Sequence, residues 1–114
     1  MEIIGVGCDI VEISRIEKAQ KNEGFLRVFT DKEKQILKRL QGRRKIEWLA
    51  GRFAAKEAIY KAISSYGNYV LSDIEVLQDT SGAPICTNTS FSVKLSISHE
   101  NTHAIAYAIA LKKE

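Results

Sequence analysis

The sequence predicts an α+β fold, with an antiparallel-rich sheet packed on a long central helix, and three observations support this prediction. An apolar stretch at residues 3–10 is typical of a strand. Residues 46–63 place apolar side chains at helical spacing over several turns. Residues 91–97 and 104–111 alternate well and are joined by a short loop, which predicts a β-hairpin. Because the chain has 114 residues, we expect residues 1–114 to form a single domain.

The first predicted strand carries Gly5 and Gly7 on one face. Glycines at such positions indicate that another backbone or a ligand comes close to that face. The strand leads into Asp9, and the spacing of Asp9 and Glu12 matches a helix capping box. We therefore expect a helix to begin near Ile10.

Two further helices are predicted in the central part of the chain. Thr30 and Glu33 form a second capping-box pattern, which opens a helix that Gly42 is expected to terminate. Residues 43–45 then form a basic turn, and the long helix continues to about Ile63.

The last part of the chain is strand-like. Residues 74–77 are typical of a short strand, and the turn at residues 79–84 contains Gly82 and the single proline. The predicted hairpin follows, so the order is one strand, then helices, then a run of strands.

The composition is that of a soluble globular protein, with 45% hydrophobic and 27% charged residues. That mixture excludes a disordered chain, and the uncharged stretch at residues 103–111 is too short to cross a bilayer. Glu2 and Asp9 flank the N-terminal apolar residues and no basic leader precedes them, so we do not expect a signal peptide. We expect a cytoplasmic protein that does not contact a membrane.

Cys8 and Cys86 lie in apolar stretches and have no partner at metal-ligand spacing. A disulfide between them is not required by the sequence. We expect two buried free thiols.

Positive charge is concentrated in the central part of the chain. The formal net charge is +3, but residues 15–61 contain 14 Lys and Arg against 6 Asp and Glu. Such a segment favours an anionic partner, which can be a nucleic acid, a phosphorylated small molecule or an acidic protein. The alternative is a pair of solvated, lysine-rich helices.

Glu57 breaks the pattern of the long helix. At about 100° per residue, one side of this helix is apolar, and Glu57 falls in the middle of that side. The other residues on this side are Ile46, Leu49, Ala50, Phe53, Tyr60 and Ser64. A carboxylate there is costly unless it is paired, and Lys61, four residues on, is one available partner. The functional alternative is that Glu57 is a metal ligand or a general base.

Arg52, Lys56 and Lys61 bracket Glu57 on the same helix. Cations around one carboxylate suit a metal ion and a phosphate together, because the carboxylate holds the metal and the cations hold phosphate oxygens. The alternative is a solvated helix face.

Two more polar residues are placed at the ends of predicted strands. Asp9 is either a helix cap or a ligand, since a strand end beside glycines is open to a ligand. His99 is a candidate to donate to a phosphate, and the adjacent Ser98 and Glu100 alternatively suggest a hydrolase fragment. No nucleophile elbow, P-loop or zinc pattern accompanies them.

Three segments resemble the signatures of the holo-[acyl-carrier-protein] synthases, which are 4′-phosphopantetheinyl transferases. Residues 5–16 (GVGCDIVEISRI) resemble the opening signature of this family, residues 51–62 (GRFAAKEAIYKA) the central signature, and residues 96–99 (SISH) the segment near the C-terminus. The segments occur in the order of the family and span nearly the whole chain.

This resemblance implies a 4′-phosphopantetheinyl transferase fold and activity. Members of the family transfer the 4′-phosphopantetheine group of coenzyme A to a serine of apo acyl carrier protein and release adenosine 3′,5′-bisphosphate, a step that supports fatty acid biosynthesis. The resemblance also implies a homotrimer with sites between neighbouring subunits.

The resemblance assigns roles to the candidate residues. Asp9 and Glu57 match the acids that hold Mg²⁺ with the diphosphate of coenzyme A. Lys61 is the catalytic candidate that stabilises the transferred phosphate. The proton acceptor for the serine is Glu57 itself or a metal-bound water oriented by it, with Glu33 as a lesser alternative. The candidates for binding coenzyme A are Arg44, Lys45, Arg52, Lys56, Lys61 and His99, and those for docking the carrier protein are Arg15 and Arg27.

Two other functions are open at this point. A small basic domain that binds nucleic acid would explain the charge but gives no reason for Glu57 on an apolar face. A non-catalytic α+β interaction module would make Asp9 a cap and Glu57 half of an ion pair.

Overall fold

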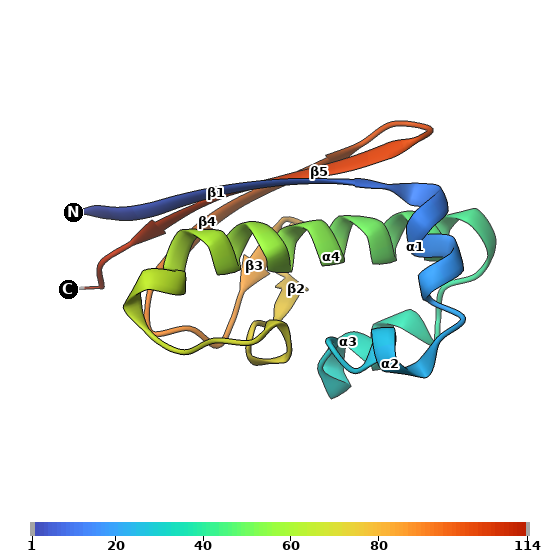
Figure 1. The fold of residues 1–114 in the computed structure, drawn as a ribbon, viewed down its shortest axis with the longest axis horizontal. Helices are drawn as coiled ribbons and strands as arrows, with labels where there is room; N and C mark the ends of the chain where they lie inside the picture. The colour runs from blue at the N-terminus through green and yellow to red at the C-terminus, as the bar shows by residue number, and fades with distance from the viewer. Residues whose placement is uncertain (1, 114) are drawn as a thin grey trace.

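The computed structural model describes residues 2–113 and has the predicted α+β architecture (Figure 1). The ends of the predicted domain, residues 1 and 114, lie outside the described residues. The elements are β1 (Ile3–Glu12), α1 (Ile13–Ala19), α2 (Glu23–Leu26), α3 (Asp31–Leu37), α4 (Gly42–Ile63), the short helices η1 (Ser64–Tyr66) and η2 (Leu71–Asp73), β2 (Val76–Gln78), β3 (Pro84–Cys86), β4 (Ser92–His99) and β5 (His103–Leu111). No helix in residues 2–113 is long and apolar enough to cross a membrane.

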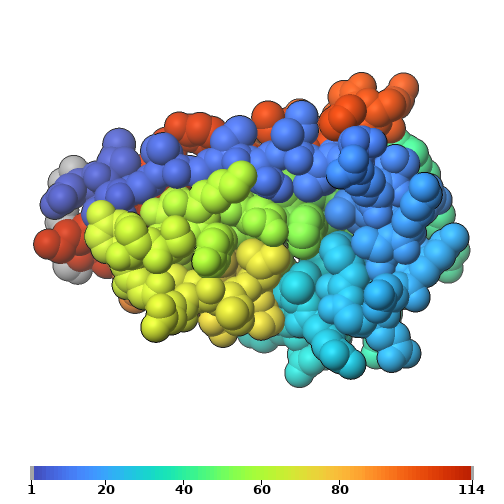
Figure 2. All heavy atoms as spheres, in the orientation of Figure 1, coloured from blue at the N-terminus to red at the C-terminus, as the bar shows by residue number. Residues whose placement is uncertain are grey.

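The long helix α4 packs against a three-stranded antiparallel sheet with the order β1-β5-β4. The predicted C-terminal hairpin is confirmed as β4 and β5, which pair from Ser92↔Leu111 to His99↔Ala104. A two-stranded ribbon of β2 and β3 lies next to β4. Figure 2 shows β1, in blue, lying along α4, in green.

Backbone contact between β1 and α4 confirms the expectation raised by the two glycines. A Cβ atom added at Gly7 would lie 1.8 Å from the carbonyl oxygen of Ala58, and one added at Gly5 would lie 1.8 Å from that of Ala62. No side chain fits in that space. The main chain of β1 therefore rests directly on the main chain of α4.

Alanines form much of the interface between α4 and the sheet. On α4 the fully buried positions include Ala54, Ala55, Ala58 and Ala62, and on β5 they include Ala104, Ala106, Ala108 and Ala110. The predicted apolar side is wrong for the C-terminal half of α4. The sheet packs on the alanine side of the helix instead, so Glu57 and Tyr60 are only half-buried and Ser64 is exposed. Small side chains on both layers let the sheet approach the helix closely.

The first strand is longer than predicted, and the Asp9–Glu12 capping box is wrong. Antiparallel pairing with β5 continues to Glu12↔His103, so the chain stays extended through Glu12. Helix α1 begins at Ile13, and the side chain of its N-cap residue, Glu12, makes no capping hydrogen bond.

The second capping box is confirmed, but the role predicted for Gly42 is wrong. The Thr30 hydroxyl accepts from the Glu33 backbone N–H at 3.3 Å, and Glu33 Oε1 accepts from the Thr30 N–H at 2.7 Å. The helix ends at Leu37, and Gly42 is the first residue of α4. Its φ of +62° is readily adopted only by glycine and leads the chain into α4. Residues 43–45 accordingly belong to the first turn of α4.

The prediction for the cysteines is half wrong. Both thiols are free, but Cys8 is exposed and Cys86 is half-buried. Alternation along β1 points Gly7 toward α4 and turns Cys8 to the outer face of the sheet.

Candidate active site at the crossing of β1 and α4

The close approach of β1 to α4 brings Asp9, Glu57 and Lys61 together. Asp9 follows the contact of Gly7 with α4, and Glu57 precedes Ala58, the residue that Gly7 touches. Lys61, one turn further along α4, donates to Asp9 Oδ1 at 3.1 Å and to the carbonyl oxygen of Cys8 at 2.9 Å. The sequence predicted that these three side chains share one site, and the structure brings them together.

Burial, followed by the negative charge of Asp9, raises the pKa of Glu57 above its usual value, while Lys61 opposes this effect. The pKa of Glu57 therefore reports a second carboxylate close by. Within the described residues, the carboxylate paired with Lys61 is that of Asp9, not that of Glu57. The simple Glu57–Lys61 ion pair considered from the sequence is not formed.

The donor set suits a hard divalent cation. Asp9 and Glu57 supply carboxylate oxygens, and the carbonyl oxygen of Cys8 already accepts from the Lys61 ammonium. Residues 2–113 hold no cluster of three or more His, Cys, Asp or Glu side chains that could form a complete metal cage. Two carboxylates fit Mg²⁺, which usually takes its other ligands from substrate phosphates and water.

Arg52 forms a second cationic centre. Its side chain lies against the ring of Trp48, with the guanidinium carbon 5.1 Å from the ring centroid. It is only 6% exposed, and its Nε and Nη2 atoms are buried without a hydrogen-bond partner. Burial lowers the pKa of Arg52, although the charge of Glu33 opposes this. Unsatisfied buried donors on a guanidinium are well suited to receive an anion.

A hollow of about 200 Å³ joins Arg52 to two other predicted phosphate ligands. Arg44 and His99 line it together with Arg52 and Glu47. His99 Nδ1 lies 3.9 Å from Glu47 Oε2, at the end of β4. The structure thus groups three of the six coenzyme A candidates on one side of α4.

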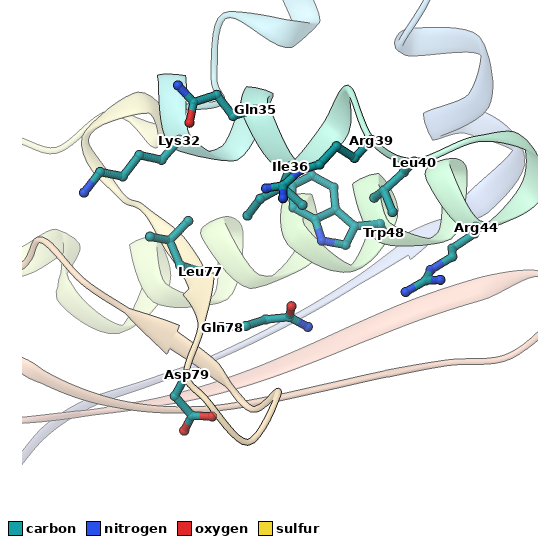
Figure 3. A pocket seen from close by; sticks show the side chains of 10 residues that line it. All are labelled: Lys32, Gln35, Ile36, Arg39, Leu40, Arg44, Trp48, Leu77, Gln78 and Asp79. Carbon is teal, nitrogen blue, oxygen red and sulfur yellow. The ribbon is translucent and has the colours of Figure 1, made fainter.

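Another hollow, of about 600 Å³, lies between α3, the start of α4 and β2 (Figure 3). Arg44 and Trp48 project into it from α4, and Gln78 projects into it from β2. Asp9 and Glu57 do not line it. Of the predicted site residues only Arg44 borders this space, which adjoins the smaller hollow through Arg44 and Trp48.

Lys56 does not belong to the phosphate site, which corrects the sequence-based assignment. Its ammonium is fully buried, pairs with Glu33 Oε1 at 2.7 Å and donates to the carbonyl oxygen of Ile74. Burial lowers the pKa of Lys56, and the hydrogen bond from Lys56 to Glu33 limits that effect. A phosphate cannot reach this ammonium without opening the core.

Glu33 is equally unsuited to act as a general base. Its side chain is fully buried, and Oε1 accepts from the Thr30 N–H and from Lys56. Its other oxygen, Oε2, accepts from the N–H of Val76 at 2.8 Å. Both oxygens are therefore occupied by structural contacts.

Lys45 is separated from the other coenzyme A candidates. It lines a different hollow, with Glu17 and Gln20 of the α1 segment. One residue along α4 turns a side chain by about 100°, so Arg44 and Lys45 face different surfaces.

One of the two predicted docking residues, Arg15, borders a groove of about 450 Å³. Arg15, Phe25, Phe53 and His103 line this groove. Arg15 is exposed, and its Nε lies 3.5 Å from Glu12 Oε1. Arg27, the C-cap of α2, is also exposed but does not line the groove.

Trp48 and Glu47 were not identified from the sequence. Trp48 lies four residues before Arg52, a spacing that stacks a ring and a guanidinium on one helix face, and this spacing was the available signal. Glu47 contacts Arg43 on its own helix and His99 on β4. The contact with His99 forms only when β4 packs beside α4, so no local sequence pattern could have predicted it.

Comparison with known proteins relates almost the whole chain to a single family. Residues 5–110 match the model of the 4′-phosphopantetheinyl transferase superfamily. A holo-[acyl-carrier-protein] synthase of Geobacillus sp. is 46% identical over 113 residues, covering 94% of this chain and 95% of the relative.

Solved structures resemble the whole fold. A holo-(acyl-carrier-protein) synthase from Bacillus anthracis, in complex with CoA (3′,5′-ADP), has a TM-score of 0.88 at 42% identity and covers 97% of this chain and 98% of its own. The Helicobacter pylori holo-[acyl-carrier-protein] synthase in complex with coenzyme A has a TM-score of 0.78 at 32% identity, with 92% and 98% covered.

Proposed function

This chain belongs to the 4′-phosphopantetheinyl transferase superfamily, and we propose that it is a holo-[acyl-carrier-protein] synthase. In this role it transfers the 4′-phosphopantetheine group of coenzyme A to a serine of apo acyl carrier protein, giving holo carrier protein and adenosine 3′,5′-bisphosphate. The observation that carries the proposal is the convergence of Asp9, Glu57 and Lys61 where β1 crosses α4. We further propose that residues 1–114 act as one domain, in the cytoplasm, in support of fatty acid biosynthesis.

Asp9 and Glu57 are the residues that would hold Mg²⁺. When bound, this ion supplies positive charge that polarises the diphosphate and offsets charge on the departing phosphate. Lys61 reaches the same place and stabilises the transferred phosphate. Glu57, whose pKa is raised, is our candidate for the group that accepts the proton of the serine hydroxyl.

Arg44, Arg52 and His99 bind phosphate groups of coenzyme A. The unpartnered Nε and Nη2 atoms of Arg52 support this assignment, because an anion in the adjoining hollow gives both donors an acceptor. The cation stack on Trp48 holds the guanidinium plane in place before the ligand arrives.

The proposed site has two groups of residues, one around Lys61 and one around Arg52, and on a single chain these groups point away from each other. Arg52 and Lys61 are nine residues apart on α4, which places them about 180° apart around the helix. A ligand that contacts both centres therefore needs two copies of the chain, one presenting Asp9, Glu57 and Lys61 and the other presenting Arg44, Arg52 and His99.

We propose that these copies form a homotrimer. Two different faces of the protein meet in such a contact, and a contact of that kind closes into a ring of three or more copies rather than a two-fold dimer. The outer face of the sheet also carries a continuous apolar patch. It consists of Val6, Cys8 and Ile10 on β1, paired with Ile109, Tyr107 and Ile105 on β5. Val6 and Ile10 are 54% and 62% exposed in the single chain, a feature typical of a surface that another subunit covers.

Carrier docking is assigned to Arg15 and Arg27. The groove beside Arg15 offers the rings of Phe25 and Phe53 next to a cation. An acidic protein with an apolar contact helix fits such a surface, and the positive charge accelerates its encounter.

The proposal is tested by incubating the protein with coenzyme A, MgCl₂ and apo acyl carrier protein and weighing the carrier by mass spectrometry. We expect the carrier to gain one phosphopantetheine group, and we expect an excess of EDTA to stop the gain. A carrier whose mass stays that of the apo form at all enzyme concentrations would rule out the transferase.

A further inference from the structure

Lys61 is the counter-ion of Asp9. Its ammonium donates to Asp9 Oδ1 at 3.1 Å and to the carbonyl oxygen of Cys8 at 2.9 Å. Its side chain is 50% exposed, whereas that of Asp9 is 16% exposed. The long lysine side chain can therefore reorient at low cost, while the strand holds the carboxylate in place.

The fold holds Asp9 next to Lys61. The backbone contact at Gly7 fixes β1 on α4 two residues before Asp9, and the Lys61 ammonium lies within hydrogen-bond distance of Asp9 Oδ1. The oxygens that Lys61 contacts, one carboxylate and one carbonyl, are also the donor types that a hard divalent cation prefers. An ammonium and a metal ion compete for the same Asp9 oxygen, because their charges repel.

Building on the proposed function, we propose that Lys61 exchanges partners during each binding cycle. In the metal-free protein it neutralises Asp9. When coenzyme A binds, its phosphates draw Lys61 away and leave Asp9 to the divalent cation. Lys61 thus weakens metal binding to the free protein and couples it to coenzyme A binding, and by linkage each ligand tightens the other by the same factor.

The exchange is measured with Mn²⁺ as a paramagnetic probe, by electron paramagnetic resonance on the full chain with and without coenzyme A. We expect Lys61→Met to bind Mn²⁺ about three- to fivefold more tightly than the unmodified protein when coenzyme A is absent. The factor by which coenzyme A tightens Mn²⁺ binding should fall by the same amount. Lys61→Arg keeps the charge and should retain the weak Mn²⁺ binding.

The matched control is Lys38→Met, which removes an equal charge from an exposed position after α3. It should leave both Mn²⁺ affinity and coupling unchanged. If Lys61 repels the metal without moving, Lys61→Met will tighten Mn²⁺ equally with and without coenzyme A, and the unchanged coupling factor will overturn the exchange. An unchanged Mn²⁺ affinity overturns it as well. If the unmodified protein binds neither Mn²⁺ nor coenzyme A, the transferase assignment fails too, and the two failures are thereby distinguished.

Discussion

Glu57 is the residue at which stability and chemistry conflict. It lies half-buried at the edge of the alanine-rich face of α4, and Asp9 raises its pKa further. A carboxyl group whose pKa is raised on folding destabilises the folded state at pH values where it is ionised. The proposed Mg²⁺ site would account for a carboxylate at this position.

We expect Glu57→Gln to reduce carrier modification by about 100-fold or more, because the amide holds a cation poorly and accepts no proton. At pH 7 the variant should melt at a slightly higher temperature than the unmodified protein. That difference should shrink as the pH falls through the raised pKa of Glu57, and it should disappear once the carboxyl group is neutral in both the folded and the unfolded state. Rates by mass spectrometry and melting curves at several pH values test both statements.

Glu2→Gln, at an exposed position before β1, is the control and should change neither rate nor melting temperature. A Glu57→Gln protein that transfers phosphopantetheine at the normal rate would remove Glu57 from the catalytic residues.

Individual residues of the site were predictable only where local sequence carries the signal. Glu57 stood out as an acid among apolar residues, and Asp9 stood out as an acid at a strand end beside glycines. The burial of Lys56 was not predictable, since its partner Glu33 is far away in the sequence and the contact exists only after α3 docks. Lys56 and Lys61 look alike in the sequence, yet one lies in the core and the other at the surface.

At the level of elements, the geometry of the site depends on two fixed contacts of α4. One is the glycine contact with β1. The other is the Lys56–Glu33 pair, which ties α4 to α3 and, through the Val76 N–H, to β2. Breaking a buried pair of this kind on one side costs about 3–5 kcal/mol. Together the contacts fix the rotation of α4, so Glu57 faces β1.

Gly7→Ala should separate β1 from α4. The new methyl would lie 1.8 Å from the Ala58 carbonyl oxygen, so the strand must shift, and we expect a loss of about 3 kcal/mol in unfolding free energy. Urea denaturation followed by circular dichroism measures it. Gly24→Ala is the control, because its methyl would meet only the side chain of Asn22 at 3.2 Å, and its effect should stay within about 0.5 kcal/mol. Equal stabilities for the two variants would contradict direct backbone packing of β1 on α4.

The elements themselves were largely predictable, because the hairpin, the long helix and the Thr30 cap follow from periodicity and capping chemistry. The residue at which β1 ends was not predictable. Asp9 and Glu12 have the spacing of a cap, but pairing with β5 satisfies the backbone first and keeps the chain extended. Pairing between the two ends of a chain leaves no local signal.

For the whole molecule, the arrangement of charge divides the work between two surfaces. The Asp9 side of α4 offers the carboxylates and Lys61, and the Arg52 side offers unsatisfied guanidinium donors. In the proposed site, the first surface would neutralise the diphosphate of coenzyme A and the second would hold a further phosphate.

Co-expression of two inactive chains tests this division. We expect Glu57→Gln and Arg44→Ala to be poor enzymes separately, and we expect their mixed assemblies to recover activity. Sites that combine Glu57 of one chain with Arg44 of the other are then intact. Carrier modification per total protein measures the recovery, and chains carrying both substitutions provide the matched inactive control. If the mixture is no more active than the average of the separate proteins, each site lies within one chain.

The glycine contact of β1 also determines which positions of this strand can be substituted during evolution. One face of the strand carries no side chains at Gly5 and Gly7, so main-chain atoms set the distance between β1 and α4 just before Asp9. The opposite face, with Val6, Cys8 and Ile10, can then be substituted without displacing the carboxylate. If another subunit covers the outer face, as we propose, the proposed subunit contact and the proposed metal ligand lie on opposite sides of the same ten-residue strand. Mutation can then alter the contact while leaving the ligand in place.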